Sequence, residues 1–481
     1  MTPLWTAAEI ARATGGRASA EFTAKGVAFD SREIGPGDLF VAMKGEATDG
    51  HRFLDQAFES GASGAVVSAE TGHPHVRVAD TARALDALGV EARARSKAKV
   101  IGVTGSVGKT STKEALFAAL DRGSPGHCHR SVKSYNNHTG VPLSLARMPR
   151  ESKFGVFEMG MNHAGELAAL TRLVRPHIAL VTAIAPAHRE FFASEEEIAD
   201  AKGEIFQGLE PGGTAIIPFD SPHRDRLIAA ARPHAGRVLT FGMGDGADVR
   251  ATYVIRATKG GTMMTATLPS AQLSLTIGQP GEHWVSNALA VLGAVEAAGG
   301  DLAAAALALA DLGGLKGRGE RHLVTVAGGG EALLIDEGYN ANPASMAATL
   351  AMLGEEKVTG RRIAVLGAMR ELGDDSDDFH IKLAEPIQAA KVDFAILVGP
   401  EMKVLAKALG GQVKLEHVPD AASAIDIARK AIGPGDAVLV KGSNSIGLAA
   451  LVEALSVGSS GLVRPEGQSQ SAAEGLGTDN D

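Results

Sequence analysis

The sequence predicts an α/β protein with three domains and mostly parallel sheets, and three observations lead to this prediction. The chain has 481 residues, which is room for about three domains. Short apolar runs alternate with helix-forming runs along most of the chain, as in parallel sheets whose strands are joined by helices. A glycine-rich turn lies between one such strand and the next helix, at residues 104–110. We therefore expect a small α/β substrate domain, a central ATPase domain of the P-loop type and a C-terminal Rossmann-like domain.

Composition argues against several classes of function. The net charge is −9 and aromatic residues make up 4% of the chain, so neither a basic surface nor stacking side chains indicate nucleic-acid binding. Cys128 is the only cysteine, which excludes disulfides and fits a reducing cytoplasm. The sequence shows no signal peptide, and its apolar runs are too short to span a membrane. We expect a cytoplasmic monomer with no nucleic-acid partner and no membrane span.

The turn at residues 104–110 has the features of a phosphate-binding loop. Gly105 and Gly108 allow a tight turn whose N–H groups face oxygen anions, at the start of a helix with a favourable dipole. Lys109 can reach the terminal phosphates of a nucleotide, and the Thr110 hydroxyl can bind magnesium. The general pattern G-x-x-x-x-G-K-[ST] requires glycine where Val103 stands, so the loop has the shorter form TGxxGKT.

The first domain is expected at residues 1–81. Ser31, Arg32, Lys44 and His51 all lie beside turns, where side chains can converge on a ligand. Taken alone, turn chemistry and solvated charge explain these residues more readily than binding does.

The central domain is expected at residues 82–312. A strand over residues 154–157 delivers Glu158 at its end, and a strand over residues 178–184 is followed by His188. Ligands and metals gather at the carboxyl ends of strands in open α/β sheets. Glu158, His188 and Thr110 could therefore share a magnesium site, although magnesium prefers oxygen ligands to histidine.

Later parts of the central domain carry further signals. Ser194 and Glu197 form a capping-box pattern at the start of a helix, and Lys202 on that helix reads by itself as a surface lysine. Residues 248–277 alternate apolar and polar side chains and predict a small antiparallel excursion from the main sheet.

The third domain is expected at residues 313–455. Strands over residues 332–335, 362–366, 394–398 and 437–440 alternate with helices, which predicts a parallel, Rossmann-like sheet. Residues 456–481 are rich in Gly, Ser, Gln and acidic residues, so we expect a disordered tail.

The motifs, taken together and in order, resemble the Mur ligase family from about residue 27 to residue 455. They are TGSVGKT at residues 104–110, AKGEIF at 201–206, GEHWVSNALA at 281–290 and DEGYNANPASM at 336–346. The last motif resembles the signature of the branch that adds a D-alanyl-D-alanine dipeptide. The family pattern G-x-H-N-x-x-N-A-L-A has Trp284 in place of its first asparagine and keeps the second, Asn287.

The resemblance implies an ATP-dependent ligase of cell-wall synthesis. A UDP-N-acetylmuramoyl tripeptide would be activated by ATP as an acyl phosphate, and the amine of D-alanyl-D-alanine would then displace phosphate to give a pentapeptide. It also implies Mg²⁺, as two ions, and a carbamate on Lys202 derived from carbon dioxide.

The same resemblance assigns roles to residues of this chain. The implied catalytic residues are Lys109, Lys202, His188 and Glu158, and the implied metal ligands are Thr110, Glu158, His188 and carbamylated Lys202. The implied ATP-binding residues are Gly105, Ser106, Val107, Gly108, Lys109, Thr110, Ser111, Asn287, Arg318, Asp336, Tyr339, Asn340 and Asn342. The UDP-linked substrate would bind at Ser31, Arg32, Lys44, Asp49, Gly50, His51, Asn137 and Thr139.

Two alternatives remain open at the level of sequence. The chain could be a tripeptide-forming Mur ligase or a folylpolyglutamate synthase, against which residues 337–343 argue. It could also be a P-loop ATPase or kinase whose outer domains bind a partner, which leaves the order of the motifs unexplained.

Overall fold

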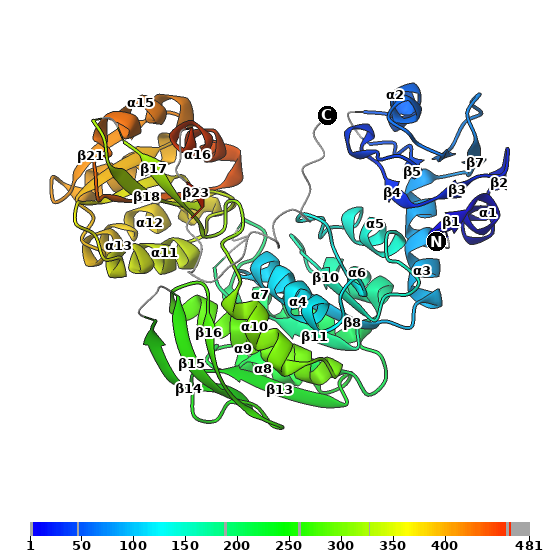
Figure 1. Ribbon diagram of the computed structural model, residues 1–481, viewed down its shortest axis with the longest axis horizontal. Helices are drawn as coiled ribbons and strands as arrows, with labels where there is room; N and C mark the ends of the chain where they lie inside the picture. The colour runs from blue at the N-terminus through cyan, green and yellow to red at the C-terminus, as the bar shows by residue number, and fades with distance from the viewer. Residues whose placement is uncertain are drawn as a thin grey trace.

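The computed structural model describes residues 3–45, 48–186, 190–257, 261–326, 328–457 and 461–462. It consists of three α/β units, and the central unit lies between the N-terminal and C-terminal ones (Figure 1). Each unit is built on its own sheet of mainly parallel strands, which confirms the predicted fold class.

The N-terminal unit has a five-stranded sheet in the order β2-β7-β6-β5-β4 and a separate antiparallel ribbon of β1 and β3. Its strands are β1 (Trp5–Thr6), β2 (Arg17–Ala18), β3 (Thr23–Ala24), β4 (Gly26–Ala28), β5 (Asp38–Val41), β6 (Gly64–Val67) and β7 (His75–Arg77). Its helices are α1 (Ala7–Thr14), α2 (Leu54–Glu59) and α3 (Thr81–Arg95), with 3₁₀ turns η1 (Ser31–Glu33) and η2 (Gly50–Phe53). Strands β5 and β6 are buried almost throughout, as is typical of parallel strands covered on both faces.

The central unit has a nine-stranded sheet in the order β16-β15-β14-β13-β12-β11-β8-β10-β9. Its strands are β8 (Lys99–Thr104), β9 (Cys128–Arg130), β10 (Phe154–Glu158), β11 (Ile178–Val181), β12 (Thr214–Pro218), β13 (Arg237–Gly242), β14 (Val249–Arg256), β15 (Thr262–Thr267) and β16 (Gln272–Ile277). The strands from β9 to β14 pair in parallel, and β14 to β16 pair antiparallel. The predicted antiparallel excursion is therefore present, as the continuation of the main sheet at one edge.

Helices cover both faces of this sheet. They are α4 (Lys109–Gly123), α5 (Gly140–Ala146), α6 (Glu166–Val174), α7 (Glu195–Gly203), α8 (Arg224–Ala231), α9 (Glu282–Ala298) and α10 (Leu302–Ala310), with the 3₁₀ turn η3 (Glu204–Gly208). One core contains residues of α4, α9 and α10, and the core on the other face contains residues of α5 to α8. Because α9 packs against the sheet, α4 and α10 at once, it is apolar on most of its surface.

The C-terminal unit has a seven-stranded sheet in the order β21-β20-β19-β22-β18-β17-β23. Its strands are β17 (Glu320–Thr325), β18 (Glu331–Glu337), β19 (Arg362–Gly367), β20 (Phe394–Val398), β21 (Lys414–Val418), β22 (Ala437–Lys441) and β23 (Gly461–Leu462). Its helices are α11 (Pro343–Glu355), α12 (Ser376–Ile381), α13 (Ala384–Ala389), α14 (Lys403–Leu409), α15 (Ala421–Ala431) and α16 (Leu448–Ser456). Helices α11 to α14 cover one face and α15 and α16 the other.

Several element boundaries differ from those expected. Strand β11 ends at Val181 instead of residue 184, and the Thr182 hydroxyl that follows it bonds the carbonyls of Thr104 and Val107. Strand β18 runs to Glu337, so Asp336 is a strand residue. Ser194 caps α7 as predicted, but Glu197 accepts from the main chain of Ala193, so the reciprocal half of the capping box is not formed.

The expected tail also begins differently. Helix α16 extends to Ser456, and Gly461–Leu462 forms a short strand that pairs with β17 at His322 and Leu323. Val457 is also described, and residues 458–460 and 463–481 lie outside the described part of the chain.

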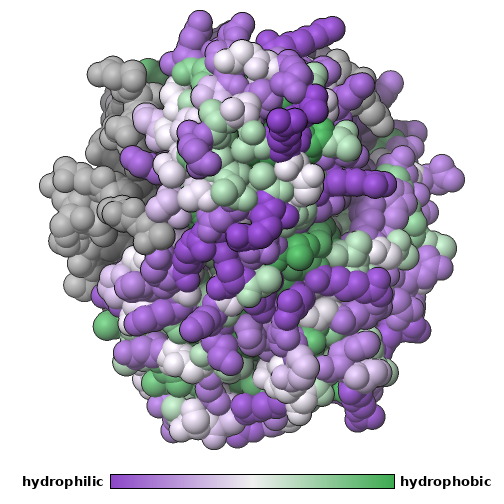
Figure 2. All heavy atoms as spheres, turned by 90° about the vertical axis from the view of Figure 1, so that its right-hand side faces the viewer, coloured by the Kyte–Doolittle hydropathy of each residue, from purple (hydrophilic) through white to green (hydrophobic). Residues whose placement is uncertain are grey.

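The face that carries the N-terminal unit is mostly hydrophilic on its coloured atoms, with small, separated hydrophobic areas (Figure 2). Within the described ranges, no helix has both the length and the hydrophobicity that a membrane span requires.

Candidate active site

The phosphate loop follows β8 and leads into α4, as the sequence predicts. Its backbone requires glycine at two positions, with φ of +149° at Gly105 and +84° at Gly108, a region that L side chains rarely adopt. A Cβ at Gly105 would lie 1.9 Å from Thr182 Oγ1, and one at Gly108 would lie 2.9 Å from Asn287 Oδ1. The Thr182 hydroxyl donates to the main-chain oxygen of Val107. The residue that follows β11, Thr182, therefore bonds the loop, and Asn287 of α9 lies directly against it.

Two polar groups of the loop have spare bonding capacity. The Lys109 side chain is half-buried, and its Nζ donates to the Gly105 carbonyl at 2.6 Å. Burial lowers the pKa of Lys109, while the charge of Glu158 opposes that shift. Ser106 Oγ is buried and has no hydrogen-bond partner among the described residues. A lysine and a hydroxyl placed in this way in a glycine turn at the start of a helix fit the phosphates of a nucleotide.

Glu158 ends β10 beside the loop, and it is 1% exposed. Its carboxylate accepts from Thr110 Oγ1 at 2.9 Å and from Asn136 Nδ2 at 2.8 Å. Thr110 and Glu158 are thus brought together, as predicted from the strand ends. A hydroxyl and a carboxylate in contact are the oxygen ligands that magnesium prefers.

Lys202, on α7, is fully buried, and its Nζ has no hydrogen-bond partner among the residues that the structure describes. Burial, and then the charge of Lys109, lower the pKa of Lys202 far below the usual value for lysine. This shift makes the neutral, nucleophilic form of the amine more accessible than in an exposed lysine. An orphaned buried amine fits a position that is completed by further chemistry, such as carbamylation.

The fourth residue predicted at this site, His188, lies outside the described residues. Within the described ranges, no group of three or more His, Cys, Asp or Glu side chains is placed to hold a metal ion. The oxygen ligands at hand come from Glu158 and the Thr110 hydroxyl, so this set offers a single carboxylate.

Lys113 is a site residue that the sequence did not reveal. It lies one turn beyond Thr110 on α4, with a fully buried side chain. Its Nζ donates to the Lys133 carbonyl at 2.7 Å, pairs with Glu114 Oε1 at 2.9 Å and lies 3.9 Å from Glu158 Oε2. The spacing of three residues from Thr110 puts both side chains on one helix face. This spacing is the sequence feature that could have identified Lys113 as a site residue.

The C-terminal unit contributes a second cluster around Asp336. This carboxylate is 3% exposed and accepts from the N–H groups of Gly317 and Gly338, at 2.8 and 3.0 Å. The Arg318 guanidinium stacks on the Tyr339 ring, 4.3 Å from the ring centroid. Asp336 thus fixes the turn that presents Arg318 and Tyr339.

The remaining asparagines of this motif have structural bonds of their own. The Asn342 side chain caps α11 by accepting from Ser345 N, and the Asn340 carbonyl accepts from Lys441 Nζ at 3.0 Å. Lys441 also lies 3.6 Å from Glu337. Burial raises the pKa of Glu337 and lowers the pKa of Lys441. Because it caps α11, the side-chain oxygen of Asn342 already has a hydrogen-bond partner.

Charged groups of the C-terminal unit lie close enough to the phosphate loop to affect it. The charges of Arg318 and Glu371, from the C-terminal unit, influence the pKa of Lys109 in the phosphate loop. The N–H of Glu190 donates to the Glu371 carbonyl at 3.3 Å, which joins the two units. A cavity of about 650 Å³ lies nearby, with α7 and its N-terminal end on one side and the segment around α12 on the other. The geometry thus places a second set of charged side chains across from the phosphate loop.

The residues predicted for UDP binding lie in two turns of the N-terminal unit. Ser31 is buried and donates to Gln56 at 3.1 Å, whereas Arg32 is exposed and pairs with Asp30 at 2.6 Å. Lys44 and Asp49 pair as an isolated β-bridge.

The second turn is held tightly. Asp49 accepts from the His51 N–H at 3.0 Å and contacts its Nδ1 at 2.6 Å, and His51 Nε2 accepts from Ser68 N at 2.9 Å. A Cβ at Gly50 would lie 2.7 Å from the Met43 carbonyl, so only glycine fits there.

Asn137 and Thr139 lie in the loop before α5. Asn137 Oδ1 accepts from the N–H groups of Thr139 and Gly140, at 3.2 and 2.9 Å. This loop runs between the N-terminal unit and Glu158, since Tyr135 packs against Phe29 with ring centroids 5.7 Å apart.

Comparison with known proteins adds independent evidence. Family models of the Mur ligase catalytic domain, middle domain and glutamate ligase domain match residues 23–93, 103–295 and 317–444. The chain is 36% identical to UDP-N-acetylmuramoyl-tripeptide–D-alanyl-D-alanine ligase of Escherichia coli K12, over 91% of this chain and 94% of that protein. The Bacillus subtilis protein of the same name is 32% identical, over 89% and 93%.

Solved structures give a consistent result. The crystal structure of MurF from Acinetobacter baumannii is similar with a TM-score of 0.81 and 30% identity, over 95% of this chain and 99% of that one. MurF ligase from Thermotoga maritima, solved in complex with ADP, is similar with a TM-score of 0.74 and 26% identity, over 89% and 96%.

Proposed function

This chain belongs to the Mur ligase family, and we propose that it is the ATP-dependent member that joins D-alanyl-D-alanine to a UDP-N-acetylmuramoyl tripeptide. The product is the pentapeptide precursor of peptidoglycan. The observation that carries this proposal is the site at the carboxyl ends of β8 and β10. It combines a phosphate loop, a buried carboxylate and a buried amine that has no hydrogen-bond partner among the described residues. The names of relatives that span nine-tenths of the chain support the choice of substrates.

The reaction needs two anions to approach each other. The terminal carboxylate of the tripeptide attacks the γ-phosphorus of ATP, ADP leaves, and an acyl phosphate forms. The amine of D-alanyl-D-alanine then attacks the acyl carbon, phosphate leaves and the amine loses a proton. Lys109 and the loop N–H groups offset the repulsion between carboxylate and phosphates, and in-line geometry requires both reactants to be fixed.

Magnesium, when bound, supplies further charge neutralisation on the phosphates. Thr110, Glu158 and His188 would hold it, as two ions in all, with Lys202 as a carbamate. Two observations support this assignment: the contact between Thr110 and Glu158, and the buried Lys202 amine, which has no hydrogen-bond partner among the described residues and has a lowered pKa.

We assign ATP to the phosphate loop, residues 105–111, together with Asn287, Arg318, Asp336, Tyr339, Asn340 and Asn342. The contact of Asn287 with Gly108 and the turn fixed by Asp336 support it. Because Asn342 caps a helix, its contribution would come through that helix end.

We assign the UDP moiety to the turns that contain Ser31, Arg32, Lys44 and residues 49–51, with Asn137 and Thr139 along the path to the active site. We keep the expected domains, residues 1–81, 82–312 and 313–455 with a tail at 456–481, as a proposal with two changes. Helix α3 (Thr81–Arg95) packs with the N-terminal unit, and α16 and β23 continue the C-terminal unit to Leu462. We expect the enzyme to act as a monomer in the cytoplasm, where ATP is available and Cys128 stays reduced.

Phosphate release from MgATP tests this proposal. The assay contains UDP-N-acetylmuramoyl tripeptide, with or without D-alanyl-D-alanine, and mass spectrometry follows the product. Release that needs both substrates, with the pentapeptide mass, is the expected result. Release with an L-amino acid in place of the dipeptide would identify a sister ligase, and release without either substrate would identify a plain ATPase.

A further inference from the structure

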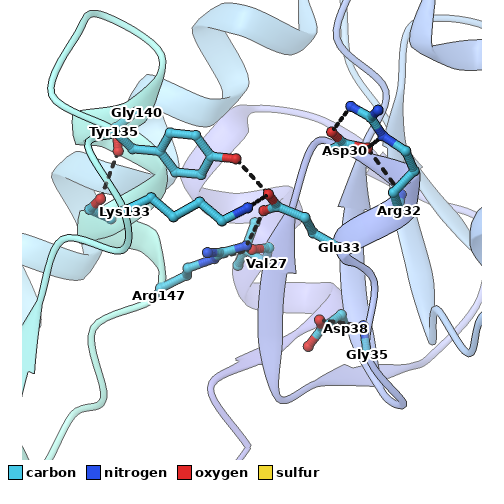
Figure 3. A network of polar contacts seen from close by, with 11 residues as sticks. Val27, Asp30, Arg32, Glu33, Gly35, Asp38, Lys133, Tyr135, Gly140 and Arg147 are labelled. Atoms are coloured by element: carbon cyan, nitrogen blue, oxygen red, sulfur yellow. Dashed lines mark hydrogen bonds and ion pairs between the residues drawn. The ribbon is translucent and has the colours of Figure 1, made fainter. Parts of the chain in front are cut away.

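A polar network joins the N-terminal unit to the loop before α5 (Figure 3). Its centre is Glu33, the last residue of η1. The Glu33 carboxylate accepts from Tyr135 OH at 2.7 Å, forms an ion pair with Lys133 and lies 3.9 Å from Arg147. All three partners belong to the central unit, so one side chain contacts three groups across the boundary between units.

The η1 turn sends its three side chains in different directions. Ser31 points into its own unit and bonds Gln56, and Arg32 pairs with Asp30 on the outer side. Figure 3 shows Glu33 directed the other way, toward Lys133 and Tyr135. The turn proposed to hold the UDP moiety is therefore attached to the central unit through its third residue.

The other end of the network reaches the metal ligands. Lys133 adopts a left-handed conformation, with φ of +52°, and its carbonyl accepts from Lys113. The next residue after Tyr135, Asn136, donates to Glu158 at 2.8 Å. Glu33 is thus connected to Glu158 through Tyr135 and its chain neighbour Asn136.

The contact between Glu33 and Tyr135 is partly shielded from solvent. Glu33 is 22% exposed, and Tyr135 packs its ring against Phe29 of the N-terminal unit. Burial works to raise the pKa of Glu33, but the bonds from Lys133 and Tyr135 outweigh it and leave the pKa lowered. Burial and the same bond raise the pKa of Tyr135 to about 12. At neutral pH a carboxylate therefore faces a phenol and cations, which is a favourable charge-assisted arrangement.

We propose that Glu33 is a positioning residue that fixes the η1 turn relative to the loop carrying Asn136, and so sets the separation between the two ends of the UDP-linked substrate. This inference rests on the proposed function. A substrate held at both ends gains affinity only if the two sites have the right spacing. A ligand that occupies one end alone gains nothing from that spacing.

Glu33→Ala tests the proposal, with Glu9→Ala as the matched control. Glu9 also joins the two units, through Arg150 at 2.6 Å, and its side chain is equally exposed at 22%. Its other carboxylate oxygen accepts from the N–H of Thr6, the N-cap of α1, so Glu9 lies away from the η1 turn. We expect Glu33→Ala to raise the KM for the UDP-linked tripeptide about tenfold, with the KM for ATP unchanged. Glu33→Gln, which can still accept from Tyr135, should recover most of the loss.

A binding measurement separates positioning from general damage. Calorimetry with UDP alone should give the same Kd for wild type and Glu33→Ala, because UDP occupies one end. Tyr135→Phe supplies a second variant, and it should raise the same KM. The inference is overturned if Glu9→Ala raises that KM equally, or if UDP alone binds Glu33→Ala more weakly by the same factor. A wild-type protein that forms no pentapeptide but binds UDP overturns the proposed function instead, and the inference with it.

Discussion

Lys113 offers a sharp test of how the candidate metal site is balanced. Its ammonium is fully buried, contacts the Lys133 carbonyl and Glu114, and lies 3.9 Å from Glu158. Lys113→Met keeps most of the apolar stem and removes the charge. Removing one partner of a buried ion pair costs about 3–5 kcal/mol. Glu114 retains Arg130 at 2.8 Å, so we expect the lower end, about 3 kcal/mol.

The informative part of the test is the response to magnesium. In the wild type, the Lys113 ammonium repels any cation that binds Glu158. Without it, Mg²⁺ should bind more tightly, and a tenfold gain in affinity adds up to ~1.4 kcal/mol of stabilisation at a given concentration. Urea unfolding with and without Mg²⁺ measures this, with the fluorescence of Trp284, which packs in the same core as α4, as the probe.

Glu114→Gln is the matched control for this experiment. It removes a partner of Lys113 but keeps the ammonium beside Glu158, so its response to Mg²⁺ should equal that of the wild type. If Mg²⁺ stabilises Lys113→Met no more than the wild type, Glu158 does not bind the ion where we place it. An equal gain in Glu114→Gln would likewise refute the electrostatic argument.

Three further predictions concern single positions. Gly108→Ala places a side chain at φ of +84° and within 2.9 Å of Asn287, so it should cost about 1–2 kcal/mol and raise the KM for ATP, measured by thermal unfolding and kinetics. Trp5→Phe leaves the buried Ala146 carbonyl without its donor and should cost about 2 kcal/mol in urea unfolding. Burial lowers the pKa of His129 to about 4, so the unfolded chain takes up a proton first as pH falls below about 6.5. Stability should therefore drop between pH 6.5 and pH 4, and His129→Gln should drop less, as urea midpoints at several pH values would show.

The sequence could predict what short segments determine. The phosphate loop depends on a strand, a glycine turn and a helix within about twenty residues, and Glu158 follows from the end of one strand. Strand β20 was predicted with both of its bounds, because apolar β-formers there are flanked by polar turns. Such features can be predicted without knowing the rest of the fold, because local propensity and the burial pattern indicate the same structure.

Contacts between distant segments could not be predicted in the same way. Glu33 and Tyr135 are 102 residues apart, and neither side chain carries a local sign of its partner. The short strand β23 pairs with β17 although its own composition indicates a tail. Such pairings depend on how the units are placed against each other, which no short window of sequence encodes.

Lys202 shows where the two kinds of information meet. Its helix begins with three glutamates and has a polar outer face, so its pattern predicts a solvated lysine. In the structure the opposite face packs against α8 and η3, and the buried amine has no hydrogen-bond partner among the described residues. Burying a lysine amine without a hydrogen-bond partner destabilises the folded state. An apolar residue at this position would remove that destabilisation. Stability therefore does not explain why a lysine stands here, whereas the carbamate proposed above would give its nitrogen a role.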